Sequence, residues 1–234
     1  MAFRFKQFSV IDKNSTLKVG TDAVLLGAWA GSGTPENILD IGTGCGLLSL
    51  MLAQRFKEAK VTGIDIHEGS VRDASENFAA SAWAERLRAK HLSLQEFSKG
   101  RLDEYDLIIS NPPFFNNALL PSAAKRKLAK HSGELSFHDL ALHVKRLLKA
   151  RGSFSLILSY ESKDEFRQIA EKTGFYLHRE MIIFPVKGKK ANRYLSEWGT
   201  FAAEPITEEL SIRNKDHIFS REYIELTKEF YLAH

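Results

Sequence analysis

Residues 37–56, NILDIGTGCGLLSLMLAQRF, are the most informative part of the sequence for predicting the fold. Its first residues have the continuous apolar character of a buried strand, and those after residue 46 have the apolar spacing of a helix. Gly42, Gly44 and Gly46 lie between them, where a tight bend from strand to helix favours glycine. The first turn of such a helix has free backbone N–H groups, so this turn is a candidate ligand site.

The same alternation of strand and helix continues along the chain. Further strands are predicted at residues 60–66, 88–94, 105–111 and 152–160. Helices are predicted at residues 46–56, 70–82, 136–150 and 162–174. Strands that alternate with helices predict an α/β, Rossmann-like, doubly wound fold with a mostly parallel, seven-stranded sheet.

The two ends of the chain depart from this alternation. Residues 175–186 and 192–203 read as two longer strands joined by a basic turn, which predicts an antiparallel hairpin at the C-terminal edge of the sheet. Residues 220–232 read as a terminal helix capped by Ser220. Alternating aromatic residues predict a hairpin extension over residues 1–20. Residues 21–234 then form the catalytic core of a single domain that spans residues 1–234.

Composition narrows the class of protein. No apolar run approaches the roughly 20 residues of a membrane span, and the first residues lack the continuous apolar region of a signal peptide. The single cysteine, Cys45, excludes an internal disulfide, so we expect a cytoplasmic protein. The eight histidines have no metal-ligand spacing, so no metal is expected. The net charge of +4 mildly favours a polyanionic partner.

The glycine turn is followed by an acidic residue at the end of the next strand. Asp65 lies about 20 residues past the turn, where a carboxylate accepts hydrogen bonds from both hydroxyls of a ribose. Asp40, just before the turn, would repel a pyrophosphate but favour a ligand with a positive centre. S-adenosylmethionine has a ribose, a sulfonium and an ammonium and no phosphate, so these residues favour it over NAD. The alternatives are a plain strand–helix connection, Asp65 as a turn residue, and Cys45 as a small filler.

The strand at residues 105–111 ends in Asn-Pro-Pro-Phe. An exocyclic amine of a nucleobase is a poor nucleophile, because its lone pair is delocalised into the ring. The side-chain oxygen of Asn111 and the carbonyl of Pro112 are two acceptors that can hold its N–H groups. Pro112 and Pro113 also stiffen the turn, and Phe114 can stack on a flipped-out base. The alternative is an Asn-Pro turn followed by core phenylalanines.

Two basic segments are candidates for contacts with nucleic acid. Residues 123–134 follow the Asn-Pro-Pro-Phe turn and contain Lys125, Arg126, Lys127, Lys130 and His131. They lie where a nucleic acid entering the base pocket would pass, and cations there suit phosphate contacts. The alternative is a solvated start of a helix. Residues 187–193, KGKKANR, form a second basic turn, which either contacts nucleic acid or is a solvated surface segment.

The motifs VGTDAVLLGAW, LDIGTGCG, GIDI and NPPF, in this order, resemble those of the class I S-adenosylmethionine-dependent methyltransferases that methylate amines. The combination of FKQF, KVGTDAVLLGAW, NPPFF and HSGELSFHDL is narrower. It resembles the bacterial tRNA adenine N6-methyltransferases, which modify the adenine at position 37 of a valine tRNA, next to the anticodon. The likeness extends from about residue 3 to residue 234.

The resemblance implies roles for individual residues. It implies that the base site holds Asn111, Pro112, Pro113 and Phe114. It implies that the cofactor is bound by Lys18, Gly20, Thr21, Asp22, Asp40, Gly42, Thr43, Gly44, Asp65, Ile66, Ser93 and Asn111. Ser93 departs from the family pattern, because such enzymes often carry an aspartate there that contacts the adenine amine. Ser93 or the nearby backbone would have to replace that contact. Thr21 is equally a candidate N-cap of the helix that follows it.

The resemblance also implies the partner, a tRNA, and we expect a monomer. Two other methyltransferase classes compete. A protein glutamine N5-methyltransferase shares the Asn-Pro-Pro motif but carries a helical substrate domain before the cofactor turn, where this chain has fewer than 40 residues. An rRNA guanine N2-methyltransferase would require an extra RNA-binding domain. A NAD-binding oxidoreductase is opposed by the glycine spacing. A non-catalytic RNA-binding module is opposed by the retained asparagine and glycines.

Overall fold

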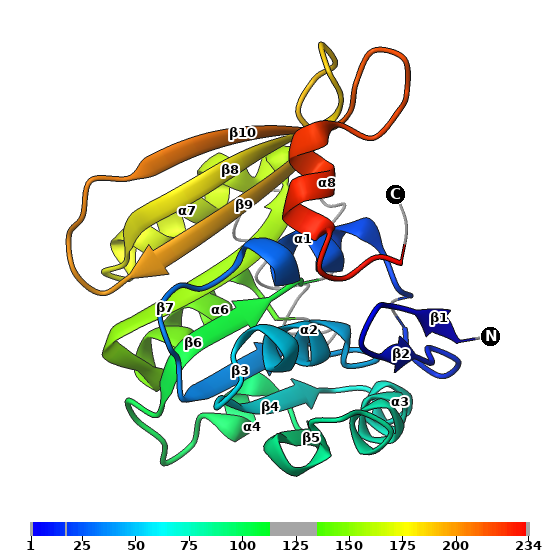
Figure 1. Cartoon of the computed structure of the whole chain (residues 1–234). Helices are drawn as coiled ribbons and strands as arrows, with labels where there is room; N and C mark the ends of the chain where they lie inside the picture. Colours follow the sequence, from blue (N-terminus) through cyan, green and yellow to red (C-terminus); the bar gives the residue numbers. More distant parts are fainter. Residues whose placement is uncertain (1, 17, 113–134, 233–234) are drawn as a thin grey trace.

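The computed structural model describes residues 2–16, 18–112 and 135–232. One twisted sheet, with the strand order β10-β8-β9-β7-β6-β3-β4-β5, runs through the molecule (Figure 1). Its strands are β3 (Asn37–Ile41), β4 (Lys60–Asp65), β5 (Leu87–His91), β6 (Tyr105–Ser110), β7 (Leu148–Ser159), β8 (Tyr176–Val186), β9 (Arg193–Gly199) and β10 (Ile206–Arg213). The predicted Rossmann-like α/β class is confirmed.

All neighbouring strands are parallel except where β9 pairs with β7 and β8. The predicted antiparallel hairpin, β8 and β9, is therefore confirmed. The predicted count of seven strands is wrong, because β10 adds an eighth strand, parallel to β8, at the edge. Leu210 is the one side chain of β10 that is buried, so the apolar pattern of this edge strand is weak.

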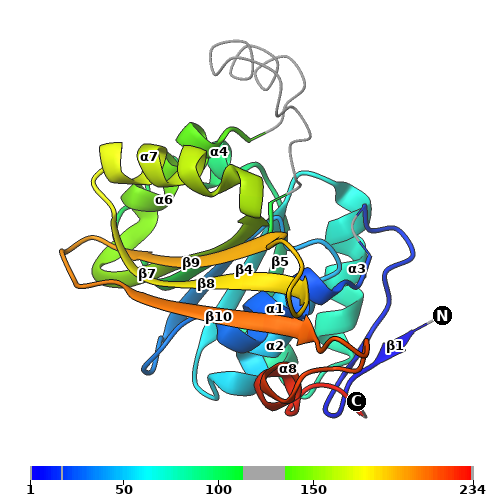
Figure 2. The ribbon, with the colours of Figure 1, turned by 90° about the horizontal axis from the view of Figure 1, so that it is seen from above.

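Helices cover both faces of the sheet (Figure 2). They are α1 (Thr21–Trp29), α2 (Leu47–Arg55), α3 (Glu68–Ala79), α4 (Leu94–Phe97), α6 (Phe137–Leu147), α7 (Lys163–Lys172) and α8 (Arg221–Thr227), with 3-10 turns η1 (Ala84–Arg86) and η2 (Tyr160–Ser162). Successive strand residues point to opposite faces. Ile38 and Leu107 pack towards α1, α2, α3 and α8, whereas Leu39 and Ile108 pack towards α4, α6 and α7.

Most predicted element boundaries agree with the structure to within a few residues. The helix predicted over residues 136–150 is too long, because α6 ends at Leu147 and β7 begins at Leu148. Both leucines are buried, so an apolar run crosses the boundary and does not mark it. Ser220 caps α8 as predicted, and its side chain accepts a hydrogen bond from the N–H of Tyr223 at 3.0 Å.

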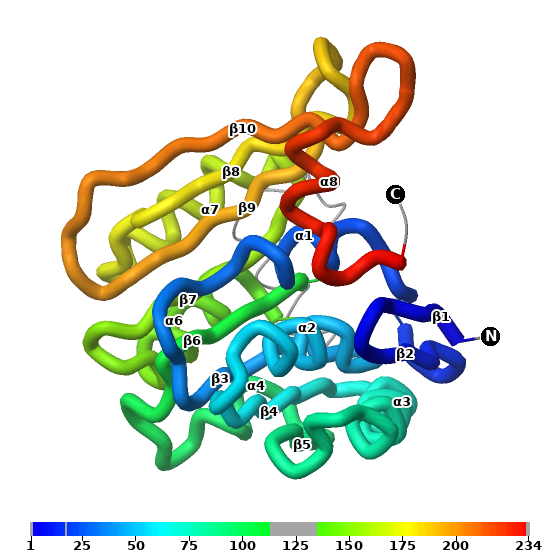
Figure 3. The backbone as a smooth tube through the Cα atoms, viewed as in Figure 1, coloured from blue at the N-terminus to red at the C-terminus, as the bar shows by residue number. Residues whose placement is uncertain are grey.

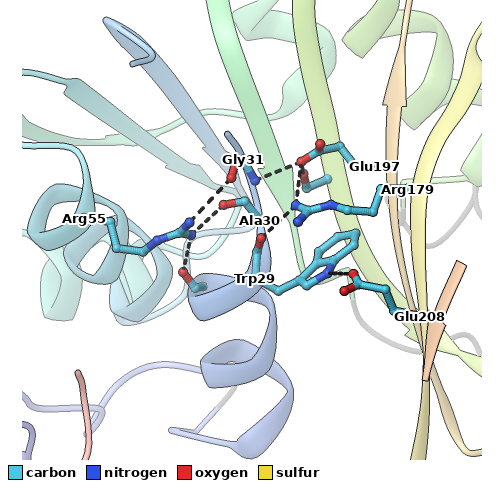
Figure 4. Close-up of polar contacts among 9 residues, drawn as sticks. Trp29, Ala30, Gly31, Arg55, Arg179, Glu197 and Glu208 are labelled. Carbon is cyan, nitrogen blue, oxygen red and sulfur yellow. Dashed lines mark hydrogen bonds and ion pairs between the residues drawn. The ribbon is translucent and has the colours of Figure 1, made fainter. Parts of the chain in front are cut away.

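The C-terminal end of α1 is fixed by a polar cluster between two helices and the sheet (Figure 4). Arg179 of β8 donates to the carbonyl of Trp29 at 2.9 Å and stacks on its ring, 4.0 Å from the centroid. Glu197 of β9 accepts from the N–H of Gly31 at 2.9 Å. Arg55 of α2 donates to carbonyl oxygens at the end of α1, and burial lowers the pKa of its guanidinium to about 10. This cluster fixes the direction of α1 and so places its N-terminal turn.

The predicted N-terminal hairpin is confirmed as β1 (Phe3–Arg4) and β2 (Ser9–Val10), an antiparallel pair. It lies beside the C-terminal segment (Figure 3). The N–H of Lys6 donates to the carbonyl of Phe230 at 2.8 Å, and the rings of Phe5 and Tyr231 stack with centroids 5.9 Å apart. Among the helices of the described residues, none is long and apolar enough to cross a membrane.

Candidate active site

Three residues that the sequence predicts to be part of the site lie side by side on adjacent strands at the carboxyl edge of the sheet. Ile41, the last residue of β3, pairs with Ile64 of β4 on one side and with Ser110 of β6 on the other. The next residues along these strands are Gly42, Asp65 and Asn111. Since neighbouring strands lie about 4.8 Å apart, this row is about 10 Å long. It also spans the point where the strand order reverses, which is where open α/β sheets bind ligands.

The glycine turn is open on the side of this row. Gly42 has a φ of +72°, and a Cβ added to it would meet no atom within 4 Å. Gly46 has a φ of +83° and serves packing, because a Cβ there would lie 2.4 Å from the ring of Phe78. A ligand can therefore approach the backbone at Gly42, while α3 packs against the other end of the turn.

Asp65 is buried and holds the glycine turn. Its Oδ2 accepts from the N–H of Gly44 at 2.9 Å, and its Oδ1 accepts from the N–H of His67 at 2.9 Å. Each carboxylate oxygen keeps a second lone pair. Asp65 can therefore accept two further hydrogen bonds, one at each oxygen. This fits the predicted contact of Asp65 with the two neighbouring hydroxyls of a ribose.

Asp40 lies beneath the turn and is fully buried. Its Oδ2 accepts from the hydroxyls of Thr43 and Ser49, both at 2.7 Å. Within the described residues its Oδ1 is buried without a hydrogen-bond partner. Burial raises the pKa of Asp40 to about 6, although the two hydroxyls oppose the shift. Asp40 thus orders the glycine turn through its two hydrogen bonds.

This raised pKa predicts a pH dependence of stability. The folded carboxyl ionises near pH 6 and the unfolded one near 3.8, so between these values the folded state binds the proton more tightly. The contribution of Asp40 to stability is therefore lost as the pH rises from about 4 to 6, by on the order of 3 kcal/mol. Urea unfolding of the wild type and of Asp40→Asn across this range measures it. The wild type is expected to lose more stability than the variant; identical pH profiles would contradict the shift.

The side of the row beyond Asp65 offers an apolar surface. Ile66 and Leu92, which follow β4 and β5 directly, are 50% and 37% exposed. Ser93 has a local role, because its Oγ accepts from the N–H of Glu96 at 3.2 Å and donates to its Oε2 at 2.7 Å. This capping box of α4 occupies the Ser93 side chain. The N–H of Ser93 donates to the same Glu96 carboxylate at 3.2 Å, and the N–H of Leu92 donates to the carbonyl of Asp65 at 3.1 Å, so these backbone donors are engaged as well.

The predicted N-terminal residues lie at the start of α1. Gly20 is the N-cap and Thr21 the first helical residue, so the alternative role of Thr21 as a cap is wrong. Asp22 forms an ion pair with Arg193 of β9, with Oδ2 and Nε 2.8 Å apart. The Lys18 ammonium donates to the carbonyl of Asp12. The structure thus fixes this segment to β9 and to the loop before it.

Two residues that the sequence analysis missed tie the N-terminal segment to the glycine turn. Asp73 of α3 is fully buried and accepts from the N–H groups of Asn14 and Ser15, at 2.7 and 2.8 Å, and from the Asn14 amide at 2.8 Å. Asn77, one helical turn later, donates to the carbonyls of Ile11 and Cys45, both at 2.8 Å. The sequence pattern that could have revealed Asp73 and Asn77 is a pair of polar residues, four positions apart, next to the apolar positions of α3.

The Cys45 thiol is buried, and this burial raises its pKa to about 11. A thiol with so high a pKa is a poor nucleophile at neutral pH, which agrees with its role as a small filler. Among the described residues, no cluster of histidine, cysteine or acidic side chains has the arrangement of a metal site.

The base site is described in part. Asn111 is half-buried and Pro112 is buried, directly after β6. The hydroxyl of Ser110 donates to the carbonyl of Ile41 at 3.0 Å, which ties the end of β6 to the start of the glycine turn. Within the described residues the Asn111 amide has no hydrogen-bond partner. The other predicted substrate residues lie outside the described residues: Pro113, Phe114, Lys125, Arg126, Lys127, Lys130 and His131.

Comparisons with known proteins show the family to which this chain belongs. The methyltransferase small domain family model matches residues 14–175, which places the chain among the methyltransferases. A protein of Phocaeicola vulgatus named tRNA1(Val) (adenine(37)-N6)-methyltransferase is 40% identical over 98% of this chain and 97% of its own length. A Vibrio vulnificus (strain YJ016) protein of the same name is 38% identical over 98% of this chain and 95% of its own length. The chain therefore belongs to the methyltransferase small domain family, in the group of the tRNA1(Val) (adenine(37)-N6)-methyltransferases.

Solved structures show the same fold at low identity. An Agrobacterium tumefaciens protein described as a predicted O-methyltransferase has a TM-score of 0.70 at 19% identity, over 92% of this chain and 99% of that one. Geranyl diphosphate C-methyltransferase from Streptomyces coelicolor A3(2), solved with S-adenosyl-L-homocysteine, has a TM-score of 0.54 at 14% identity, over 76% of this chain and 77% of that one. These likenesses confirm the fold class.

Proposed function

We propose that this protein transfers a methyl group from S-adenosylmethionine to the N6 amine of an adenine in tRNA, at position 37 of a valine tRNA as in the relatives. The observation that carries the proposal is the row of Asp65, Gly42 and Asn111 in register on three adjacent strands, in a chain that is 40% identical to such an enzyme over nearly its full length. This row combines a ribose acceptor, an open backbone turn and an amide acceptor within about 10 Å.

The residues of the row fit S-adenosylmethionine, which supplies an electrophilic methyl group on a sulfonium. Asp65 offers two oxygens to the ribose hydroxyls, and Ile66 offers an apolar surface to the adenine ring. Gly42 and Gly44 let the backbone approach the ribose and the amino-acid part. The buried Asp40 carboxylate, with one oxygen unpartnered among the described residues, favours a cation above the turn. Lys18 to Asp22 lie over the methionine end in this proposal.

Asn111 and Pro112 prepare the nucleophile in the proposed reaction. The Asn111 side-chain oxygen and the Pro112 carbonyl each accept one N–H of the target amine. Both hydrogen bonds strengthen as the nitrogen becomes tetrahedral, so they stabilise the transition state more than the ground state. The nitrogen forms a bond to the methyl carbon as the carbon–sulfur bond breaks, and the electron pair of that bond stays on sulfur. The resulting ammonium is acidic and releases one proton to water, so no general base is required.

The proposal extends to residues that follow the described part of β6. Phe114 stacks on the flipped adenine, Pro113 stiffens the turn, and Lys125, Arg126, Lys127, Lys130 and His131 contact tRNA phosphates. The resemblance of the NPPFF motif and the charge of this segment support these roles. A single methyltransferase domain that acts as a cytoplasmic monomer is part of the same proposal.

Nucleoside mass spectrometry of tRNA from cells that lack this protein tests the proposed function. N6-methyladenosine is expected to disappear from valine tRNA and to return with the wild-type gene but not with Asn111→Ala. An unchanged nucleoside profile would refute the tRNA assignment. Loss of a methylated glutamine or of a methylated rRNA guanine would instead support one of the two competing methyltransferase classes.

A further inference from the structure

Two basic loops, distant in sequence, lie side by side at the carboxyl edge of the sheet. Residues 187–190 follow β8 and residues 213–217 end and follow β10, and these two strands are parallel. The N–H of Lys187 donates to the carbonyl of Arg213 at 2.8 Å, which joins the loops. Both project from the edge at which β3, β4 and β6 end (Figures 1 and 2). We call them the paired basic loops.

The paired basic loops hold a concentrated positive charge. The loops contain five basic residues and one acidic residue: Lys187, Lys189, Lys190, Arg213, Lys215 and Asp216. Their net charge is therefore +4, as large as that of the whole chain. The four lysines are exposed. Among the described residues, no ion pair involves any of these four ammonium groups. Their charge is thus available to a partner.

The second loop is ordered by its own hydrogen bonds. The Asn214 side-chain oxygen accepts from the N–H groups of Asp216 and Ile218, at 2.9 and 3.0 Å. The Arg213 guanidinium lies over the Phe219 ring, 4.1 Å from the centroid. Lys215 and His217 are exposed at the turn between them. A cation presented on an ordered turn loses less conformational entropy on binding than one on a flexible chain.

The paired basic loops lie too far from Asn111 to contact the target base, but they can contact the backbone of the substrate RNA. Between β6, which carries Asn111, and β8 and β10 there are three and four strand spacings, or about 15–20 Å. This is the length of about five stacked nucleotides at 3.4 Å each. Arg193, at the start of β9 beyond the first loop, is ion-paired with Asp22 of α1, which connects this region to the predicted cofactor segment.

We propose that the paired basic loops bind phosphates of the tRNA several nucleotides away from the methylated adenine. The proposal rests on the proposed function for the nature of the substrate. It assigns part of the RNA interface to the two loops that follow β8 and β10, which the sequence analysis did not bring together. Backbone contacts of this kind give affinity and register without reading the sequence.

The test is the salt dependence of tRNA binding. Each neutralised phosphate adds about 0.7–0.9 to the slope of log affinity against log salt. The triple variant Lys187→Gln, Lys189→Gln, Lys190→Gln is expected to have a slope smaller by about 2–3. Between 50 and 200 mM salt the wild type should then lose about 20- to 40-fold more affinity than the variant. Filter binding of unmodified valine tRNA measures both, and Lys215→Gln should reduce the slope by about 0.7–0.9.

A matched control removes the same charge from the opposite edge of the sheet. The control changes three exposed lysines together to glutamine. They are Lys60, which begins β4, Lys57 just before it, and Lys172, which ends α7 before β8. The control is expected to keep the wild-type slope, and all variants to bind S-adenosylmethionine as the wild type does. Equal slopes for the loop variant and the wild type, or equal reductions in the loop variant and the control, would overturn the proposal. Wild-type protein that neither binds nor methylates tRNA would instead refute the proposed function.

Discussion

Replacing Asn111 with alanine is expected to lower turnover by about 10²–10³-fold, the scale of one preorganised polar contact to a transition state. The side chain lies at the end of β6, beside the glycine turn, and among the described residues its amide has no other partner. In the proposed mechanism its oxygen accepts an N–H of the target amine. Binding of S-adenosylmethionine is expected to change little, because in this account the amide faces the base.

Single-turnover methylation of tRNA and calorimetric binding of S-adenosylmethionine are the two measurements for this variant. Asn111→Asp is the matched comparison, because it keeps an acceptor oxygen of the same reach and should keep more activity than Asn111→Ala. Near-normal turnover of the alanine variant would refute the assigned role. Equal losses in turnover and in cofactor affinity would show that Asn111 holds the cofactor and not the base.

Replacing Asp65 with alanine is expected to weaken binding of S-adenosylmethionine by roughly 1.5–3 kcal/mol, the value of hydrogen bonds to a charged acceptor. This corresponds to about a 10- to 150-fold higher Kd. The loss has two sources, since Asp65 accepts from the N–H of Gly44 as well as offering lone pairs to the ribose. Isothermal titration with S-adenosylmethionine and with its demethylated product measures the effect.

The matched control for Asp65 is Glu68→Ala, which removes an exposed carboxylate three residues later in the chain. This control should bind the cofactor as the wild type does. An Asp65→Ala variant with unchanged affinity and unchanged stability would contradict the cofactor site. A variant that unfolds at lower denaturant yet binds normally would limit Asp65 to ordering the turn.

The central part of the site was predictable from the sequence because each group follows a strand. Asp65, Gly42 and Asn111 come directly after apolar runs, and parallel strands bring their carboxyl ends to one edge. The register could not be predicted, since it depends on the hydrogen bonds of Ile41 with two strands that are distant in sequence. Asp73 was missed for the same reason, because its partners lie 58 and 59 residues away along the chain.

Three errors came from local patterns that tertiary structure overrides. β10 was missed because its one buried residue, Leu210, gives no alternation of apolar residues. The start of β7 was placed in a helix because Leu147 and Leu148 continue the apolar spacing of α6 into the strand. Thr21 suits a cap by residue type, but it is already the first residue of the helix, so the cap position falls one residue earlier, at Gly20.

Transfer of a labelled methyl group from S-adenosylmethionine to an unmodified valine tRNA, followed by nucleoside mass spectrometry, shows whether this protein methylates the N6 amine of adenine 37. A second transcript with guanine in place of adenine 37, the position named in the relatives, is the matched substrate. We expect N6-methyladenosine in the first transcript and no methylation of the second. Equal methylation of both transcripts, or no transfer to tRNA by protein that binds the cofactor, would contradict this expectation.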